Sequence, residues 1–581
     1  MSATDSQQQT CLEFLIELKA PSRLGARDAS LFSAHPEGAT HAQKLLGWTT
    51  LCSQPPYPIS ELKRQADAIR AEGLDGVVLI AQGGSSQAAM TITKLSEVNG
   101  ESDIDFKTMD SLSPIFVNHI LGSLDPSRTL YIVSSKSGST IEPLMLERVA
   151  WQYVSDHLGE AAAAQRFVAI TEPDSKLEQL ARDKGYRHIF PAPLDVGGRF
   201  SALTVFTLLP AALAGIDIEQ VIAEALKTEK ACKCDDPDNP ALKLAAFLYE
   251  AYLEGRDKFS LILPPISQVF GLWVEQLVAE SLGKEGKGIL PNIEVDASIL
   301  SVYRADRSVI TYLIGDNEGF RESIANVDKD IPIRSYTLET PKEAFSRFII
   351  WEYAIAFVSI LLEVFPFDQP DVEITKCLVR ELLYEKKGVS DSPDNREPQG
   401  VSIHDDYHEI AFPGSSIRSL RISRALMEEA SIDPDEVLRS LFKSLRKGDY
   451  FSLNAFLPFR GYGRREALER MRNRVASRLG VVSCLEIGPR YLHSTGQFHK
   501  GGPNTGVFLL LSADEDNDIA IPGEDFTLGM LASIQAQGDF AALASRGRRV
   551  AHFHLSGNGS EALSHFADRI CAAISATKRP L

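Results

Sequence analysis

The chain has 581 residues, 44% of them hydrophobic, and its 78 acidic side chains outnumber its 60 basic ones, which gives a formal net charge of −18 at pH 7. Such a chain can bury a large core and is expected to divide into roughly three to five domains, while the acidic balance argues against nucleic acid or an anionic membrane as the main partner. The longest apolar run, residues 348–362, is interrupted by Glu352 and falls short of the roughly 18–20 uncharged residues of a membrane span. Residues 1–10 lack a basic-then-apolar signal pattern, so we expect a cytoplasmic protein.

An arm with one helix, at 59–72, opens the chain and is expected to cover the edge of a sheet. The apolar run 77–80 follows and leads directly into a Gln-Gly-Gly-Ser-Ser turn, which predicts a buried parallel strand, a glycine turn and the start of a helix. Glycine lets the backbone approach a ligand closely, and the free amides of a helix start attract phosphate. Gly84 and Ser85 in this turn are therefore candidate binding residues, although the spacing is not that of a dinucleotide-binding fingerprint.

The same pattern returns with more polar chemistry at 130–140. An apolar strand is predicted first, followed by the turn Ser-Lys-Ser-Gly-Ser-Thr and a helix. Hydroxyl groups, one ammonium and the amides of a helix start can together surround a phosphate monoester, so the candidate phosphate ligands are Ser135, Lys136, Ser137 and Thr140. The alternative is a polar turn that only caps the helix. The loop lacks a Walker pattern and therefore indicates phosphate binding rather than nucleotide hydrolysis.

Two further strands are predicted at 166–170 and 188–190, with helical segments between and after them. This alternation predicts a doubly wound α/β domain with an open parallel sheet, and ligands of such sheets bind at the carboxyl ends of the strands, where both serine loops lie. Next in the chain, Gly198 and Arg199 precede an apolar helix. An arginine after two glycines can direct its guanidinium into a cleft, and the alternative is a surface turn with a solvated arginine.

The segment 273–288 is the strongest candidate for the centre of the chemistry. Its side chains recur at helical spacing, so Gln276 and Glu280, four residues apart, share one helix face, and three glycines then end the helix. A carboxylate in the last helical turn faces the negative end of the helix dipole, which raises its pKa and makes it a better proton acceptor near neutral pH. On periodicity alone, a charged surface helix is the favoured alternative.

Residues 236–384 form a second predicted unit of the doubly wound class. It is expected to contain two strands and two long helices, at 259–263, 309–314, 342–362 and 370–384. Gln369 directly precedes the last helix, and Lys376 lies about two turns inside it.

A charged stretch with two prolines, at 385–401, is the predicted linker to the C-terminal part, and residues 402–581 are interpreted as a separate α+β domain. The loop 491–506 holds two histidines and four glycines, a density that favours a functional loop over a plain connection, and His493 is its candidate residue. The segment from His404 to His408 has ligand types that a metal could use, but a solvated loop is preferred for want of a third partner. The predicted division is an arm at 1–70, doubly wound domains at 71–235 and 236–384, a linker at 385–401 and a C-terminal domain at 402–581.

Five separated segments resemble the glucose-6-phosphate isomerase family, whose members have two doubly wound sugar-isomerase domains. The sequence Ala-Glu-Ser-Leu-Gly-Lys around Glu280, with Gln276 four residues before it, is similar to the catalytic segment of that family. The resemblance covers residues 75–384 well and beyond them mainly the loop of His493. The arrangement also resembles the isomerase portion of transaldolase–isomerase fusion proteins, without their transaldolase portion.

The resemblance implies a role for each candidate residue. Glu280 would be the base that moves a proton between C1 and C2 through an enediolate, and Arg199 beside Gly198 would stabilise the intermediate. His493 and Lys376 would move protons during ring opening. The substrate would be bound by Gly84, Ser85, Ser135, Lys136, Ser137, Thr140, Gly198, Gln276 and Gln369. The implied reaction interconverts glucose 6-phosphate and fructose 6-phosphate and requires no metal or organic cofactor, so the expected partner is a small sugar phosphate.

One segment departs from the family order, because His493 follows Lys376 in this chain instead of lying between the glutamate and the lysine. The resemblance implies a homodimer whose histidine crosses to the neighbouring subunit, yet a histidine on an appended domain could reach the site of its own chain. Two other functions fit such domains: a sugar-phosphate-binding regulator without turnover, and an isomerase or transferase of another phosphosugar. A transferase of amino sugars would need an ammonia source or a nucleophilic cysteine, and Cys232 and Cys234 are interpreted as plain reduced thiols.

Overall fold

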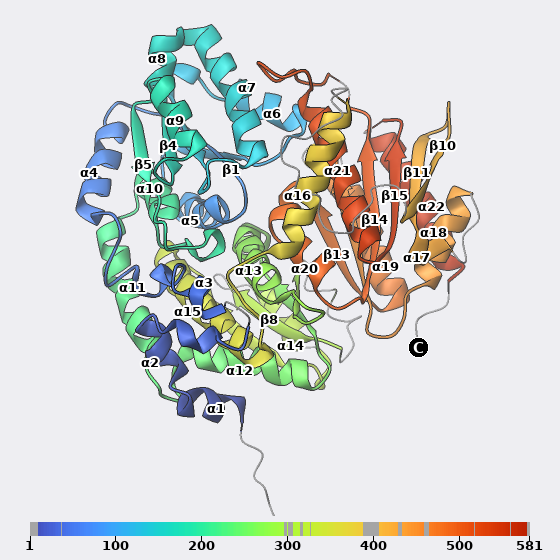
Figure 1. Ribbon diagram of the computed structural model, residues 1–581, viewed down its shortest axis with the longest axis horizontal. Coiled ribbons are helices and arrows are strands. Elements are labelled where there is room, and N and C mark those ends of the chain that lie inside the picture. Colours follow the sequence, from blue (N-terminus) through green and yellow to red (C-terminus); the bar gives the residue numbers. More distant parts are fainter. Residues whose placement is uncertain are drawn as a thin grey trace, which may run out of the picture.

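The computed structural model describes residues 10–577 apart from 36–37, 101, 295–298, 300–305, 314–317, 326, 387–405, 428–432, 458–463, 516 and 558. Three sheets covered by helices lie beside one another, and the C-terminal part forms the orange and red half of the molecule (Figure 1). Most of the predicted linker, and His404 with it, lies outside the described residues.

The first sheet has five parallel strands in the order β2-β1-β3-β4-β5. They are β1 (Gly76–Ala81), β2 (Asp105–Met109), β3 (Thr129–Ser134), β4 (Phe167–Thr171) and β5 (His188–Pro191). Every residue of β1, β3 and β4 is buried, as expected of strands covered on both faces. The predicted open parallel sheet of a doubly wound α/β domain is therefore confirmed.

Helices cover both faces of this sheet and wrap its outer edge (Figure 1). They are α4 (Ile59–Arg70), α5 (Gln87–Val98), α6 (Pro114–Gly122), α7 (Ile141–Leu158), α8 (Glu160–Ala164), α9 (Lys176–Asp183), α10 (Val205–Leu213) and α11 (Ile218–Cys232), preceded by α1 (Cys11–Glu17), α2 (Ala20–Gly25) and α3 (Gly38–Ala42). Strand order reverses between β1 and β3, which pair from Gly76 with Thr129 to Ala81 with Ser134. The glycine turn and the serine loop therefore leave the sheet at one level, at the point where such folds bind ligands.

The second sheet has four parallel strands in the order β7-β6-β8-β9. They are β6 (Lys258–Ile262), β7 (Leu290–Glu294), β8 (Ser308–Leu313) and β9 (Ile333–Thr337), and the helices are α12 (Pro240–Leu253), α13 (Gln268–Leu282), α14 (Glu318–Ala325), α15 (Pro341–Leu362) and α16 (Pro370–Lys386). The helical stretch Lys342–Leu362 of α15 is long and apolar enough to cross a membrane, but 72% of its apolar window is buried inside the fold. Helix α15 therefore serves as a core helix.

Helix α13 lies at the centre of the molecule. It packs against α5 of the first domain, β7 and α15 of the second, and α20 of the C-terminal part. All residues from Trp273 to Leu282 are buried, so the alternative of a charged surface helix is wrong. A helix that is enclosed on all sides tolerates polar side chains only where they have partners, and Gln276 and Glu280 have them.

The third sheet is mixed, with the order β10-β11-β15-β14-β12-β13. Its strands are β10 (Tyr407–Ala411), β11 (Ile417–Ser423), β12 (Tyr450–Phe456), β13 (Val482–Ile487), β14 (Gly506–Ala513) and β15 (Arg549–Leu555), and its helices are α17 (Arg424–Met427), α18 (Pro434–Lys443), α19 (Arg464–Leu479), α20 (Gly496–Gly501), α21 (Leu528–Ser545) and α22 (Ser560–Ser575). The last four strands of that order are parallel, and β10 and β11 form an antiparallel hairpin at one edge.

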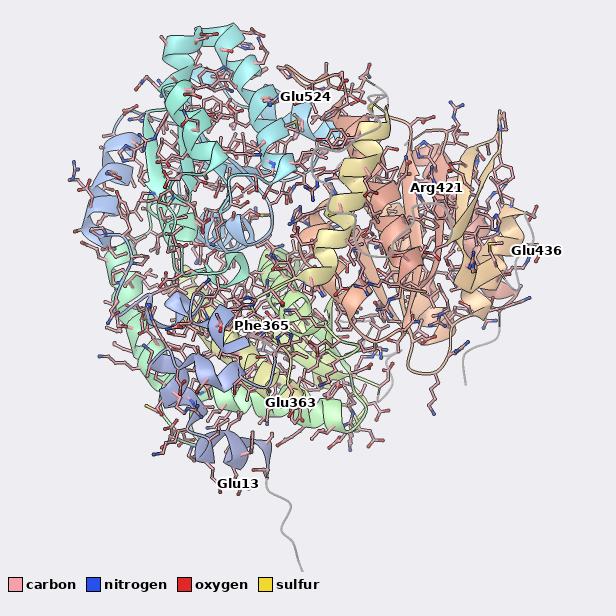
Figure 2. All side chains as sticks on the ribbon, viewed as in Figure 1. Glu13, Glu363, Phe365, Arg421, Glu436 and Glu524 are labelled. Atoms are coloured by element: carbon pink, nitrogen blue, oxygen red, sulfur yellow. The ribbon has the colours of Figure 1, made fainter. Side chains whose placement is uncertain are left out.

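The C-terminal part packs against both other sheets. Phe526 and Leu531 share an apolar cluster with Leu146 of α7, and Arg148 Nη1 lies 2.9 Å from Oε1 of Glu524 at this contact (Figure 2). A second cluster joins Phe498 of α20 to Ala279 of α13. Helix α16 lies along α21 (Figure 1). The C-terminal part is therefore held against both sugar-isomerase-type domains.

Candidate active site

Glycines allow three distant segments to meet beside α13. Gly83 has φ +55°, and a Cβ there would lie 3.0 Å from Nε2 of Gln276 and 3.2 Å from Cβ of His493. A Cβ on Gly84 would overlap the backbone carbonyl of Gly198, a contact that no side chain tolerates. The turn after β1 therefore contacts the Gly198 turn, α13 and the histidine loop at once, which the sequence pattern alone did not reveal.

Glu280 lies in the last turn of α13 with only 8% of its side chain exposed. Its Oε2 accepts hydrogen bonds from Nη1 of Arg199 and Nε2 of Gln276, each at 3.2 Å. Burial raises the pKa of Glu280, and the charge of Arg199 and the amide of Gln276 partly oppose that rise. The direction agrees with the sequence prediction, but burial is the main cause.

Arg199 is buried, so the alternative of a solvated surface arginine is wrong. Its guanidinium binds Glu280 and also Oε1 of Gln369, at 3.1 Å. The remaining partners of its N–H groups are Ser281 Oγ at 2.9 Å and the carbonyl oxygens of Asp368 at 2.8 Å and of Pro366. One planar fork therefore links Glu280, Gln369 and the segment between α15 and α16.

Lys284 is a site residue whose role the sequence did not reveal. Its Nζ donates to the carbonyl oxygen of Phe365 at 2.5 Å and to both the carbonyl oxygen and Oδ1 of Asp368 at 2.6 Å. Burial and the nearby charge of Arg199 lower its pKa to about 7. Lys284 and Arg199 together hold the segment that carries Gln369.

His493 reaches the site from the C-terminal domain of the same chain. Its Nε2 donates to Oε1 of Glu142 at 3.0 Å, and 18% of its side chain is exposed. Burial lowers the pKa of His493, but the charge of Glu142 and its hydrogen bond outweigh that effect, so the net shift is upward. Burial conversely raises the pKa of Glu142, and the charge and hydrogen bond of His493 reverse that shift, so the net shift is downward. The ionised carboxylate of Glu142 and the protonated imidazole of His493 therefore stabilise each other.

Glu142 was not among the sequence-predicted residues. It lies in the first turn of α7, two residues after Thr140, where the helix dipole favours an anion. Its position two residues after the predicted phosphate loop was the sequence feature that could have indicated Glu142 as a site residue. Its partner lies 351 residues away in the chain, a contact that only the fold reveals.

The predicted phosphate loop lies next to the glycine turn. Ser134 Oγ donates to the carbonyl oxygen of Ser85 at 3.4 Å, and Ser135 Oγ donates to Oγ1 of Thr140 at the same distance. The ammonium of Lys136 instead lies 2.5 Å from Oε1 of Glu172. Ser137 is exposed and contacts Ser139. The hydroxyls of the loop thus hydrogen-bond one another, and its lysine is paired with Glu172.

Lys376 is a predicted site residue that the structure leaves largely exposed and paired with a neighbour on its own helix. It is 47% exposed, and its Nζ lies 2.6 Å from Oε1 of Glu373. Its positive charge nevertheless acts on His493 and lowers the pKa of that imidazole, so it lies near the edge of the site.

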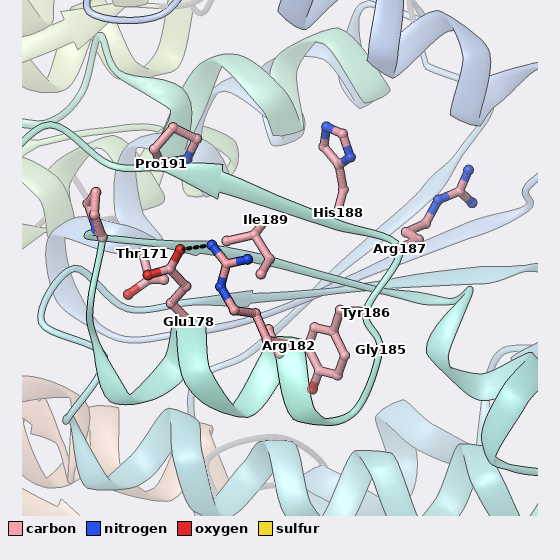
Figure 3. A pocket seen from close by; sticks show the side chains of 11 residues that line it. Thr171, Glu178, Arg182, Gly185, Tyr186, Arg187, His188, Ile189 and Pro191 are labelled. Atoms are coloured by element: carbon pink, nitrogen blue, oxygen red, sulfur yellow. Dashed lines mark hydrogen bonds and ion pairs between the residues drawn. The ribbon is translucent and has the colours of Figure 1, made fainter.

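A hollow of about 510 Å³ lies elsewhere, beside the edge strand β5 and helix α9 (Figure 3). Glu178 and Arg182, one turn apart on α9, line this hollow and form an ion pair of 2.6 Å (Figure 3). No sequence-predicted site residue lines this hollow.

The two doubly wound domains meet at a buried glutamate and a buried arginine. Serine and glycine loops lie beside this pair at the switch point of the first sheet. This arrangement defines a protein of the sugar-isomerase-domain class. A family model described as phosphoglucose isomerase matches residues 67–293. The glucose-6-phosphate isomerase of Symbiobacterium thermophilum is 31% identical over 392 residues, which cover 58% of this chain and 86% of the relative. That of Mycoplasmopsis pulmonis is 28% identical over 393 residues, covering 59% and 90%.

Two solved structures share the fold. A hypothetical protein from Thermus thermophilus superposes with a TM-score of 0.53 at 25% identity, covering 64% of this chain and 97% of that one. A glucose-6-phosphate isomerase from Chlamydia trachomatis superposes with a TM-score of 0.51 at 19% identity, covering 65% and 87%. The chain belongs to the phosphoglucose isomerase family.

Proposed function

We propose that this protein catalyses the reversible aldose–ketose isomerisation of glucose 6-phosphate and fructose 6-phosphate in the cytoplasm. The observation that carries the proposal is the buried Glu280, which is paired with Arg199 and Gln276 beside the glycine turn. Family membership supports the same reaction, because the curated relatives are glucose-6-phosphate isomerases.

Glu280 acts as the base that carries a proton between C1 and C2. A buried carboxylate with a raised pKa accepts a carbon-bound proton more readily than a solvated one and can return it to the neighbouring carbon. The intermediate is an enediolate, whose developing negative charge needs a fixed positive partner. Arg199 supplies that charge without reorganisation, since its fork is already held by surrounding acceptors.

His493 moves a proton to or from the ring oxygen when the sugar ring opens. Its raised pKa increases the fraction of the imidazole that is protonated near neutral pH, which favours its action as an acid there. Glu142 holds the ring by accepting from Nε2, which leaves Nδ1 to face a ligand. Lys376 at the rim is the proposed second proton carrier, and reaching the sugar requires it to leave Glu373.

The phosphate group is held by the serine loop as a remote anchor. Hydroxyls of Ser135, Ser137 and Thr140, with the amides at the start of α7, provide donors at the switch point. The ammonium of Lys136 contributes only when it leaves Glu172. Gly84 and Ser85 close the other side of this crevice, and Gln276 and Gln369 contact the sugar.

The first experiment is a coupled dehydrogenase assay of fructose 6-phosphate conversion by the purified full chain without added metal. We expect turnover that Glu280→Gln reduces by about 10²–10⁴-fold. Glu285→Gln is the matched control, because that carboxylate is 51% exposed just beyond the same helix and should leave turnover unchanged. Absence of turnover, with phosphosugar still bound, would replace the isomerase by a sugar-phosphate-binding regulator.

We further propose that each chain forms a complete site by itself. Support comes from Glu280 and Glu142, which both lie near His493 of their own chain. Mixing inactive Glu280→Gln chains with inactive His493→Ala chains should therefore restore no activity, even if the protein forms a homodimer. Activity that reappears after mixing under conditions of subunit exchange would mean that the histidine crosses to a partner.

A further inference from the structure

Glu142 receives two hydrogen bonds from the C-terminal domain, and only one of them comes from His493. The second donor is Nε2 of Gln535 on α21, at 2.7 Å from the same Oε1. Both side chains are buried, with Glu142 at 2% and Gln535 at 3% exposure. An ionised carboxylate can only accept hydrogen bonds, so the amide nitrogen of Gln535 must face it.

The hydrogen bonding of Gln535 indicates that its amide serves to hold the carboxylate of Glu142. Its Oε1 is buried and has no hydrogen-bond partner among the described residues, and the same holds for Oε2 of Glu142. A buried amide that served only to stabilise α21 would gain by satisfying both of its ends. The side chain is instead held at one end, by the carboxylate that orients His493.

We propose that Gln535 is a positioning residue that fixes the carboxylate of Glu142 and thereby the orientation and charge of His493. The inference rests on the proposed isomerase function for its kinetic consequence, but the geometry can be tested without turnover. Charges that face His493 come from Glu142 on α7, Glu280 on α13 and Lys376 on α16. The first of these is the one that Gln535 contacts.

Removing the amide of Gln535 should change the pKa values of Glu142 and His493 in defined directions. Without the donor of Gln535, the ionised form of Glu142 loses stabilisation, and the imidazolium of His493 loses part of its partner. The pKa of Glu142 should therefore rise, by about one pH unit for the loss of one hydrogen bond to a charged group, and the pKa of His493 should fall by less than that, because its partner is less firmly held in the ionised form.

The test measures the titration of His493 directly. Wild type and Gln535→Met are carbethoxylated with diethyl pyrocarbonate between pH 5 and about 9, and the modification of His493 is followed by peptide mass spectrometry, since only the neutral imidazole reacts. The matched control is Gln537→Met on the same helix, where the amide donates to Ser533 Oγ at 3.3 Å and not to Glu142. Gln535→Asn, which withdraws the amide by one methylene, provides a second variant if the methionine variant folds poorly.

We expect the midpoint for His493 to fall in both Gln535 variants and to stay unchanged in Gln537→Met. The basic limb of kcat/KM should move to lower pH by the same amount. An unchanged midpoint in folded Gln535 variants overturns the proposal and reduces the contact to packing. Failure of the isomerase function would show instead as wild-type chains that never turn over, whatever the midpoint does.

Discussion

Replacing Arg199 by methionine tests the electrostatic design of the site. Methionine keeps the unbranched apolar stem of the side chain but is shorter and removes every N–H donor, including those that contact Glu280, Gln369 and Ser281. Both members of the pair with Glu280 are nearly buried, at 5% and 8% side-chain exposure. Breaking a buried pair by removing one partner costs about 3–5 kcal/mol of stability.

The kinetic loss follows from the role proposed for the guanidinium. Removal of one donor to a developing oxyanion typically lowers kcat by about 10²–10³-fold, or about 2.7–4 kcal/mol. Arg199 also lowers the pKa of Glu280, so its removal should raise that pKa further. Since the base acts in its ionised form, the acid limb of kcat/KM should move to higher pH.

The assays are urea unfolding at pH 7.5 and coupled kinetics between pH 5.5 and about 9, with the exposed Arg64→Met as the control. The double variant Arg199→Met, Glu280→Gln should unfold at higher urea concentration than Arg199→Met alone, because it leaves no unpaired buried charge. An acid limb that stays in place, together with a double variant no more stable than the single one, would falsify the assignment of Arg199 as the partner of the base.

Three further outcomes follow from the contacts described above. Glu142→Gln should lower the pKa of His493 and reduce kcat/KM by about 10-fold or more, with the basic limb of the pH profile moving to lower pH. Lys284→Met should release Asp368 and lower kcat/KM by about 10–100-fold, while the affinity for inorganic phosphate measured by calorimetry stays the same. Glu486 is buried, and its pKa is raised to about 7. Between about pH 4.5 and 7 the folded chain therefore keeps a proton on Glu486 that the unfolded chain has lost. The free energy of unfolding should fall as pH rises over that range. Urea midpoints of Glu486→Gln should fall less over that range, and equal slopes would contradict the assignment.

The sequence predicted the central strands well and the edge strands poorly. Runs such as 77–80 and 130–134 are apolar throughout because their strands are covered on both faces. Strands β2, β7 and β9 lie at sheet edges, where charged and proline residues are tolerated, and their sequences DFKTM, LPNIE and IRSYT carry no such run. Pattern reading therefore found the central strands and the edge strand β5 but missed the edge strands β2, β7 and β9.

In the candidate site, likewise, the sequence predicted a relation between residues close together in the chain and missed relations between residues far apart in it. Helical spacing placed Gln276 and Glu280 on one face, since that relation depends only on a separation of four residues within one helix. The pairing of Lys136 with Glu172 joins two separate loops, and a local motif cannot reveal it. The burial of α13 was also missed, because its charged residues resembled a solvated face until three domains enclosed them.

The arrival of His493 from the C-terminal domain has a consequence for how activity depends on dilution. When a catalytic histidine comes from another subunit, its supply ends once the protein is diluted below the dissociation constant of the dimer. Here the histidine and the glutamates around it belong to one covalent chain, and tethering within a chain gives an effective concentration on the order of millimolar whatever the amount of protein in solution. Turnover per chain should thus remain constant down to concentrations at which an assembly of separate subunits has fallen apart.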